Sequence, residues 1–98
     1  MEDKTCLSDD EVESELKELD GWVRKGLYLK KDFVFDNWAD INKFLPFFTK
    51  TIVEENHHPD FSFKGASRTL SLEMTTHSEG GLTRADITVA RALNNWNS

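Results

Sequence analysis

The sequence predicts an α+β fold with two layers, in which three helices cover one face of a four-stranded antiparallel sheet in the order α-β-β-α-β-β-α. Three segments have apolar residues at spacings of three and four, which is typical of helices with one buried face. Between them lie two pairs of short segments in which apolar and polar residues alternate, each pair joined by a turn that contains glycine. Short strands joined as hairpins favour an antiparallel sheet with one apolar face, which the helices must cover.

The chain of 98 residues fits one domain over residues 1–98, with residues 1–6 expected to form a flexible tail. Its formal net charge of -6 argues against direct nucleic-acid binding, which needs a basic surface to contact phosphates. No apolar run approaches the ~20 residues of a membrane helix, and no secretory signal begins the sequence, so we expect a cytoplasmic protein without a membrane partner. The single cysteine, Cys6, cannot form an internal disulfide, and we expect no reactive role for it.

The first helix is predicted from its capping residues. Ser8 can act as the N-cap, and Glu11 three residues later completes a capping box. Leu7 and Val12 can pack across the first turn, so we expect the helix to run from Ser8 to about Leu19.

Two strands are predicted over residues 22–25 and 27–35, joined by a tight turn at Gly26. Apolar and polar residues alternate along the second strand, as in a sheet with one covered face. Lys31 falls on the apolar side of this alternation and indicates a bulge or an edge position. The apolar side comprises Leu27, Leu29, Phe33 and Phe35.

The second helix is predicted from residue 36 or 37 to residue 55 or 56. Pro46 lies in its middle, lacks an N–H and crowds the preceding turn, so we expect a kink or a break there. Phe44 and Phe47 lie outside the apolar stripe and could pack either in the core or against a partner subunit. The stripe that should face the core comprises Trp38, Ile41, Leu45, Phe48 and Ile52.

A second hairpin is predicted after Pro59. Phe61 and Phe63 alternate with polar residues, residues 65–67 supply a turn, and a further alternating stretch covers residues 69–75. The continued alternation places the next histidine, His77, on the polar face of the sheet.

The third helix is predicted to begin after Thr83 as its N-cap, with Asp86 at the third helical position. The carboxylate of Asp86 can interact with the positive end of this helix, or it can orient a histidine. The residues expected to be buried are Ala85, Val89, Ala92, Leu93 and Trp96.

The three histidines are the strongest chemical signal of the sequence, since all lie between residues 57 and 77. A structural interpretation places a histidine cation at the carbonyl end of the second helix, where it gains about 0.3 to 1 kcal/mol, but this accounts for one histidine of three. A zinc site with His77 and Asp86 as further ligands is a second interpretation, although the adjacent His57 and His58 project in different directions. General acid/base catalysis is the third, because imidazole titrates nearest to neutral pH.

The pattern His57-His58-Pro59, Thr75-Thr76-His77, Gly81-Leu82-Thr83 and Asp86 resembles the pterin-4a-carbinolamine dehydratase family, and the resemblance covers nearly the whole chain. It implies an α+β fold and a hydro-lyase that dehydrates a 4a-hydroxytetrahydropterin to the quinonoid dihydropterin. That reaction belongs to tetrahydrobiopterin recycling after the aromatic amino acid hydroxylases.

The same resemblance implies the roles of individual residues. His57, His58 and His77 are the candidates for a group that helps hydroxide leave C4a and for a group that accepts a proton from the ring. Asp86 would orient or tune them. No metal and no organic cofactor is implied. The residues that would contact the pterin, partly through backbone groups, are Asn56, Thr75, Thr76 and Ser78.

The sequence departs from the family pattern at two positions. Relatives usually carry a polar residue four before the first histidine, where this chain has Val53, and an aromatic residue six after the proline, where it has Gly65. The turn before His77 also looks about two residues longer, so we expect a changed rate or proton route.

Some members of the family are dimerisation partners of a homeodomain transcription factor. A non-catalytic dimerisation or coactivator module, with a nuclear as well as a cytoplasmic location, is therefore the alternative function. Phe44 and Phe47 keep this alternative open as an apolar helical surface. The resemblance also implies a homodimer or homotetramer, although Pro46 argues against assembly through the second helix.

Overall fold

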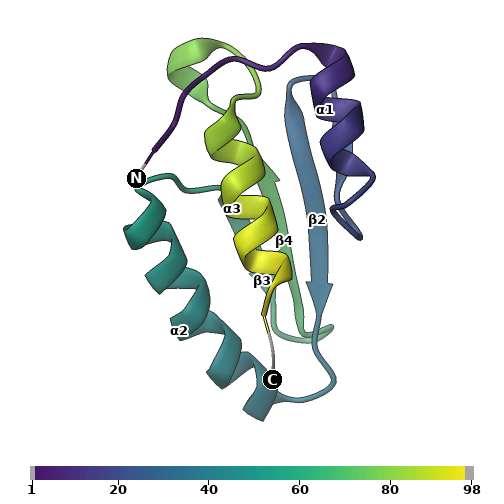
Figure 1. Cartoon of the computed structure of the whole chain (residues 1–98). Helices are drawn as coiled ribbons and strands as arrows, with labels where there is room; N and C mark the ends of the chain where they lie inside the picture. Colours follow the sequence, from purple (N-terminus) through teal and green to yellow (C-terminus); the bar gives the residue numbers. More distant parts are fainter. Residues whose placement is uncertain (1, 97–98) are drawn as a thin grey trace.

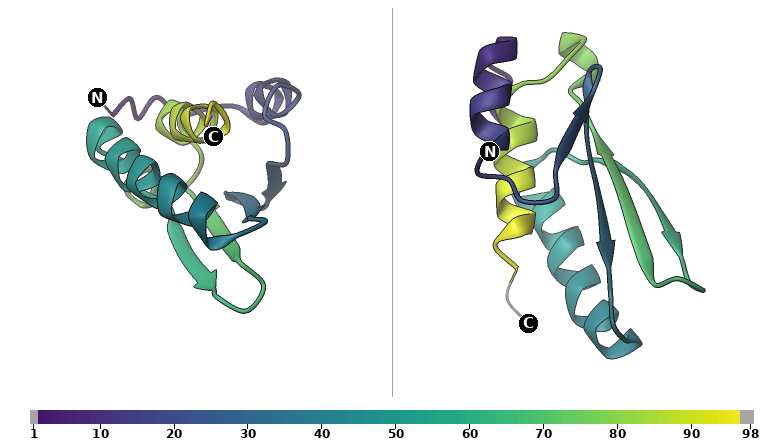
Figure 2. Two further views of the ribbon diagram at one scale, coloured as in Figure 1. Left: turned by 90° about the horizontal axis from the view of Figure 1, so that it is seen from below. Right: turned by 90° about the vertical axis from the view of Figure 1, so that its right-hand side faces the viewer.

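The computed structural model describes residues 2–96, and within them three α-helices cover one face of a four-stranded antiparallel sheet (Figure 1). This arrangement confirms the fold class and the element order that the sequence predicts. Views from below and from one side show the helices as one layer and the strands as the other (Figure 2). The elements are α1 (Asp9–Leu16), β1 (Val23–Lys25), β2 (Tyr28–Val34), α2 (Trp38–Glu55), β3 (Asp60–Lys64), β4 (Thr69–Met74), the 3-10 helix η1 (His77–Glu79) and α3 (Arg84–Asn94).

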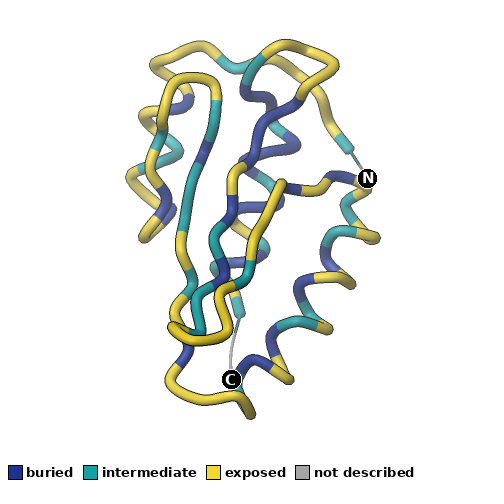
Figure 3. Tube along the Cα trace, turned by 180° about the vertical axis from the view of Figure 1, so that it is seen from behind, coloured by how far each residue is buried: buried dark blue, intermediate teal, exposed yellow. Residues whose placement is uncertain are grey.

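The sheet has the strand order β1-β2-β4-β3, so the two long hairpin strands β2 and β4 lie at its centre. Leu29 pairs with Met74, and Phe33 pairs with Leu70, which places these four side chains on the face under the helices. The opposite face is open, as the exposed positions along the strands show (Figure 3). Val34 on that face is 70% exposed. The alternation in the sequence therefore reports the two faces of the sheet correctly.

Lys31 lies on the inner face without a bulge, since it pairs with Leu72 of β4 in an unbroken register. The alternative, an edge position, holds locally: although β2 is internal in the strand order, β1 pairs only with Tyr28–Lys30 and ends before Lys31. Its ammonium group donates hydrogen bonds to the carbonyl oxygen of Asp20 at 2.8 Å and to Oδ1 of Asn94 at 2.7 Å. A long side chain can bury its stem and still bring its charge to polar partners, which explains why the alternation is misleading here.

Helix α1 begins with the capping box that the sequence predicts. The backbone N–H of Ser8 donates to Oε1 of Glu11 at 2.9 Å, and the N–H of Glu11 donates to Oγ of Ser8 at 3.2 Å. The helix ends at Leu16, earlier than expected. Turns follow it, one of them closed by a hydrogen bond from Leu19 N–H to Leu16 O. Gly21 then takes a φ of 81°, which favours glycine.

Helix α2 runs unbroken from Trp38 to Glu55, so of the kink or break expected at Pro46, the break does not occur. The face of α2 that packs on the core differs from the predicted stripe. Phe44, which was expected to lie outside the stripe, is fully buried in its own chain. Trp38 is 57% exposed instead, and its ring packs at 5.6 Å against that of Phe63. The first turn of α2 thus lies at the margin of the sheet, where the core no longer covers it.

Helix α3 is buried on more than one side because it lies between α1 and α2 over the sheet (Figure 2). Ile87 and Ala90 are fully buried in addition to Val89 and Leu93. Glu15 of α1 binds Arg84 on its outer side at 3.0 Å. The position of α3 matters for the site, because its first turn carries Asp86.

We predict that Phe44→Ala lowers the free energy of unfolding by about 3 to 5 kcal/mol, as for other large aromatic residues removed from a core. The ring of Phe44 lies within 5.6 Å, centroid to centroid, of those of Phe33, Phe35 and Trp96. Urea unfolding measures the loss. Val34→Ala on the open sheet face is the control and should change stability by less than about 0.5 kcal/mol. Equal effects of both substitutions would contradict this description of the core.

Candidate functional site

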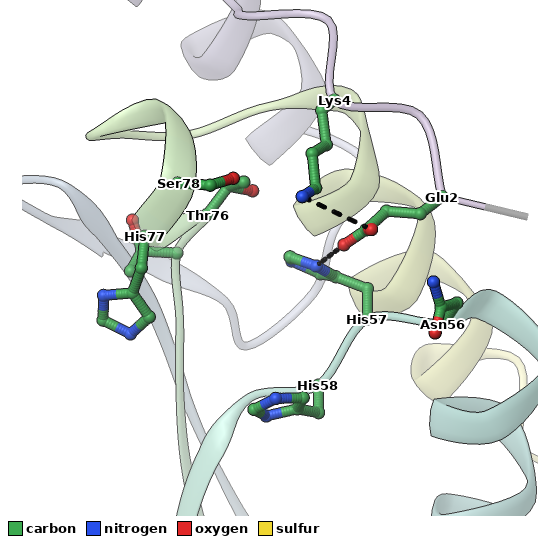
Figure 4. Close-up of a pocket in the computed structure, with 9 residues that line it drawn as sticks. Glu2, Lys4, Asn56, His57, His58, Thr76, His77 and Ser78 are labelled. Atoms are coloured by element: carbon green, nitrogen blue, oxygen red, sulfur yellow. Dashed lines mark hydrogen bonds and ion pairs between the residues drawn. The ribbon is translucent and has the colours of Figure 1, made fainter.

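A cavity of about 380 Å³ opens where the end of α2, the end of β4, η1 and the N-terminal segment meet (Figure 4). Three separate stretches of the chain therefore build one site. Most of its walls are polar side chains. The lining residues are Glu2, Lys4, Asn56, His57, His58, Thr75, Thr76, His77 and Ser78.

Asn56 determines how the chain enters this cavity. It is the C-cap of α2 and takes a left-handed conformation with φ 54° and ψ 38°. Asparagine tolerates this region better than most residues, and a left-handed residue ends a helix abruptly. The chain turns at this point, and the next residue, His57, is buried with 7% of its surface exposed, whereas His58 is exposed.

The imidazole of His57 lies between two carboxylates. Its Nε2 is 2.7 Å from Oδ1 of Asp86, and its Nδ1 is 2.6 Å from Oε2 of Glu2. An ionised carboxylate only accepts hydrogen bonds, and a neutral imidazole has a single N–H, so this geometry fits the doubly protonated ring. The hydrogen bond to Asp86 raises the pKa of His57, the bond to Glu2 acts in the same direction, and burial opposes both.

Asp86 is fully buried behind His57 and forms the base of the site. Its Oδ2 accepts hydrogen bonds from the backbone N–H of Thr83 and from Oγ1 of Thr76, each at 2.9 Å. The hydroxyl groups of Thr76 and Thr83 are 2.7 Å apart, so Thr83 donates to Thr76. Asp86 thus interacts with the first turn of α3 and with a histidine at once, which are the two contacts considered for it from the sequence.

His58 and His77 lie closer to solvent than His57. The side chain of His77 is 71% exposed, and its Nε2 is 3.9 Å from Oδ2 of Asp60. Its ring also meets that of Tyr28 edge-on at 6.4 Å. Figure 4 shows His77 across the cavity from His57, with its imidazole directed away from that residue. The structure brings the three histidines to one cavity, and among them His57 is the one held between two carboxylates.

The residues named as pterin contacts from the sequence all line the cavity. Asn56 and Ser78 are exposed, whereas Thr75 and Thr76 are buried. The hydroxyl of Thr76 donates to Asp86, and its backbone N–H donates to Gly81 O at 3.1 Å. Thr76 therefore supports the carboxylate and has little capacity left for a ligand.

The N-terminal segment supplies two residues that sequence reasoning missed. Glu2 and Lys4 line the cavity, although residues 1–6 were expected to form a flexible tail. In the structure, the carbonyl oxygen of Thr5 accepts a hydrogen bond from the N–H of Arg84 at 2.9 Å. The backbone of Cys6 pairs with that of Thr83 in an isolated antiparallel β-bridge. These backbone bonds hold residues 2–6 along the start of α3; Met1 lies outside the described residues. Isolated charged residues near a chain end have no pattern that could have indicated this.

Within residues 2–96, no three His, Cys, Asp or Glu side chains are grouped as a metal site would require. No helix of that same part of the chain has the length and apolar character needed to cross a membrane. Val53, where the family resemblance led us to expect a polar residue, is 78% exposed and does not line the cavity.

Comparison with known proteins gives one consistent answer. The family model described as pterin 4 alpha carbinolamine dehydratase matches residues 5–96. A protein of Thermomicrobium roseum, provisionally named as such a dehydratase, is 36% identical over 87 residues, which are 89% of this chain and 91% of the relative. A similarly named protein of Sulfolobus acidocaldarius is 34% identical over 88 residues, covering 90% of this chain and 94% of the relative.

A solved structure agrees with the sequence relatives. The crystal structure of a transcriptional coactivator/pterin dehydratase from Brucella melitensis superposes with a TM-score of 0.81 at 27% identity. The match covers 90% of this chain and 94% of that one. With the matched family model and the arrangement of histidines around one cavity, this shows that the chain belongs to the pterin 4 alpha carbinolamine dehydratase family.

Proposed function

We propose that this chain is a hydro-lyase that dehydrates a 4a-hydroxytetrahydropterin to the quinonoid dihydropterin, in tetrahydrobiopterin recycling, by histidine acid/base catalysis. The observation that carries the proposal is the buried His57 between Asp86 and Glu2, at a cavity that His58 and His77 also line. Membership of the dehydratase family supplies the substrate class.

The reaction requires one proton to be given and one to be taken. The bond between C4a and its hydroxyl oxygen breaks, and a proton must reach that oxygen so that water leaves. The electron pair of a ring nitrogen forms a double bond to C4a, and a ring N–H proton is lost to a base. Imidazole groups suit both tasks near neutral pH, and each proton transfer typically contributes ~10²- to 10⁴-fold.

The environments of the three histidines favour different tasks. His57 is buried against carboxylates and suits the role of a cation that stabilises the departing hydroxide. His58 and His77 are exposed at the cavity and can exchange protons with both substrate and solvent. The scheme uses only side chains of this chain, with no metal and no organic cofactor.

The cavity suits a small polar heterocycle. Its volume of about 380 Å³ lies near the lower end of the ~300 to 1,000 Å³ usual for sites that bind small molecules. Its walls present hydroxyl, amide and imidazole groups from Asn56, Thr75 and Ser78 beside the histidines. A pterin ring has hydrogen-bond donors and acceptors around its edge that such groups can pair.

A dimerisation or coactivator module is the second candidate. Trp38, Val53 and Phe61 are apolar side chains that are each more than half exposed, and such side chains are available for contact with a partner. The related Brucella protein is described both as a coactivator and as a dehydratase. Phe44 no longer supports this candidate, because the core of its own chain covers it.

An assay with freshly prepared 4a-hydroxytetrahydropterin tests the enzyme. We expect the wild type to accelerate dehydration. We expect His77→Ala to lower kcat by about 10²- to 10⁴-fold, as for other general acids and bases, and His57→Ala by about 10²- to 10³-fold, as for other groups that stabilise a developing charge. Stopped-flow absorbance measures the rate. Lys64→Ala, an exposed change away from the cavity, is the control and should retain full activity. A folded wild type without activity would favour the interaction module instead.

The buried ion pair also predicts a pH dependence of stability. Because pairing with Asp86 raises the pKa of His57 above its value in the unfolded chain, its contribution is full below about pH 6.5 and is lost as pH rises through the folded pKa. Asp86→Asn should therefore destabilise the protein most near pH 6, and less as the pH rises toward 9. Urea unfolding at a series of pH values measures the difference. Asp32→Asn, an exposed control, should follow the wild type, and a destabilisation that grows with pH would refute the pairing.

A further inference from the structure

Glu2 is placed by the fold at the most deeply buried histidine of the cavity. Fifty-five positions separate it from His57 in the sequence, yet its Oε2 is 2.6 Å from the ring nitrogen Nδ1. The side chain of Glu2 is 17% exposed, so this contact is largely shielded from solvent. Glu2 lines the cavity, and Figure 4 shows its carboxylate between the His57 ring and Lys4.

We propose that Glu2 is a positioning residue of the dehydratase site, which fixes His57 from the cavity side and favours its doubly protonated ring. This inference rests on the proposed function for its catalytic meaning. Asp86 accepts a hydrogen bond from Nε2 on the buried side of the ring, and Glu2 accepts one from Nδ1 on the other side. Because both ring nitrogens have a carboxylate partner, the orientation of the ring is fixed and a proton is favoured on each nitrogen. The N-terminal segment is thus part of the site.

The backbone keeps Glu2 within reach of the ring. Arg84 N–H donates to Thr5 O at 2.9 Å, and Leu7 N–H donates to Leu82 O at 3.1 Å. These bonds anchor the segment to the start of α3, which is the same turn that carries Asp86. The start of α3 therefore carries Asp86 and also anchors the segment that carries Glu2, so this one turn positions both carboxylates around His57.

The charges around His57 balance in this arrangement. Asp86 and Glu2 contact the ring itself, and the ammonium group of Lys4 lies 3.7 Å from the other oxygen of Glu2. His58 is the remaining titratable group among the cavity neighbours on the α2 side, and His77 is the one on the η1 side. Two carboxylates thus face two cations, and the removal of one carboxylate leaves a net positive cluster that disfavours the protonated ring.

Glu2→Gln separates the charge from the hydrogen bond, because the amide oxygen can still accept from Nδ1–H. We expect the titration midpoint of His57, followed by NMR of its Cε1–H group, to move to lower pH than in the wild type. We expect kcat at pH 8 to fall by about tenfold, the lower end of the loss when a partner that orients a histidine is removed. The activity loss should grow with pH, since the alkaline limb of the profile moves to lower pH.

Asp3→Asn is the matched control. It removes one negative charge from the same segment, where the side chain of Asp3 accepts hydrogen bonds from the N–H and the hydroxyl of Thr5. It should leave both the titration of His57 and the pH profile of activity as in the wild type. Circular dichroism verifies that each variant is folded.

The outcomes separate this inference from the proposed function. If Glu2→Gln leaves the midpoint of His57 and the pH profile unchanged, or if it raises kcat, then Glu2 is not a positioning residue. If the wild type does not dehydrate the pterin at all, the proposed function fails, and the NMR titration, which needs no substrate, still decides whether Glu2 governs the protonation of His57.

Discussion

The contact between Asp86 and His57 is the interaction on which the rest of the site depends. A fully buried carboxylate is costly unless hydrogen bonds and an opposite charge compensate it. In this protein the compensation comes from Thr83, Thr76 and His57, which belong to the start of α3, the end of β4 and the end of α2. The requirement to satisfy one anion therefore joins the ends of α2 and β4, which line the cavity, to the start of α3 behind them.

The Asp86–His57 pair therefore affects both the stability of the fold and the chemistry proposed for the site. Removal of one partner from a buried ion pair is strongly destabilising, because the other charge is left without compensation. The same pair raises the pKa of His57 and orients its ring at the cavity, as the proposed role of stabilising a departing hydroxide requires. Helices α1 and α2 contribute indirectly, since they hold α3 against the sheet and so fix the position of Asp86.

The fold could be predicted from the sequence because its elements have clear periodic patterns. The capping boxes at Ser8 and Thr83 and the alternation along β2 and β4 are local signals, and they located the elements within a few residues. The patterns mislead where contacts with residues outside the element determine whether a side chain is buried. Lys31 lies on the apolar face because its ammonium group reaches Asn94, far away in the sequence, and Trp38 is exposed because the core ends before it.

The site was predictable only in part, for the same reason. The three histidines and Asp86 stand in a recognisable pattern, and the structure brings them to one region, although the catalytic role of each remains a proposal. Glu2 carries no local signal, since its partner is distant in the sequence and the contact exists only once Thr5 and Leu7 have paired with the start of α3. Likewise, the different exposure of His57 and His58 follows from the left-handed turn at Asn56, which sequence spacing does not show.

The protonation state of the His57 ring at neutral pH tests the account most directly. NMR of the protein labelled with nitrogen-15 in its histidines distinguishes protonated from unprotonated ring nitrogens by chemical shift and by the one-bond coupling to hydrogen. The account predicts that Nδ1 and Nε2 of His57 both carry a proton at pH 7, as two carboxylate partners require. A neutral ring with one bare nitrogen at that pH would contradict it.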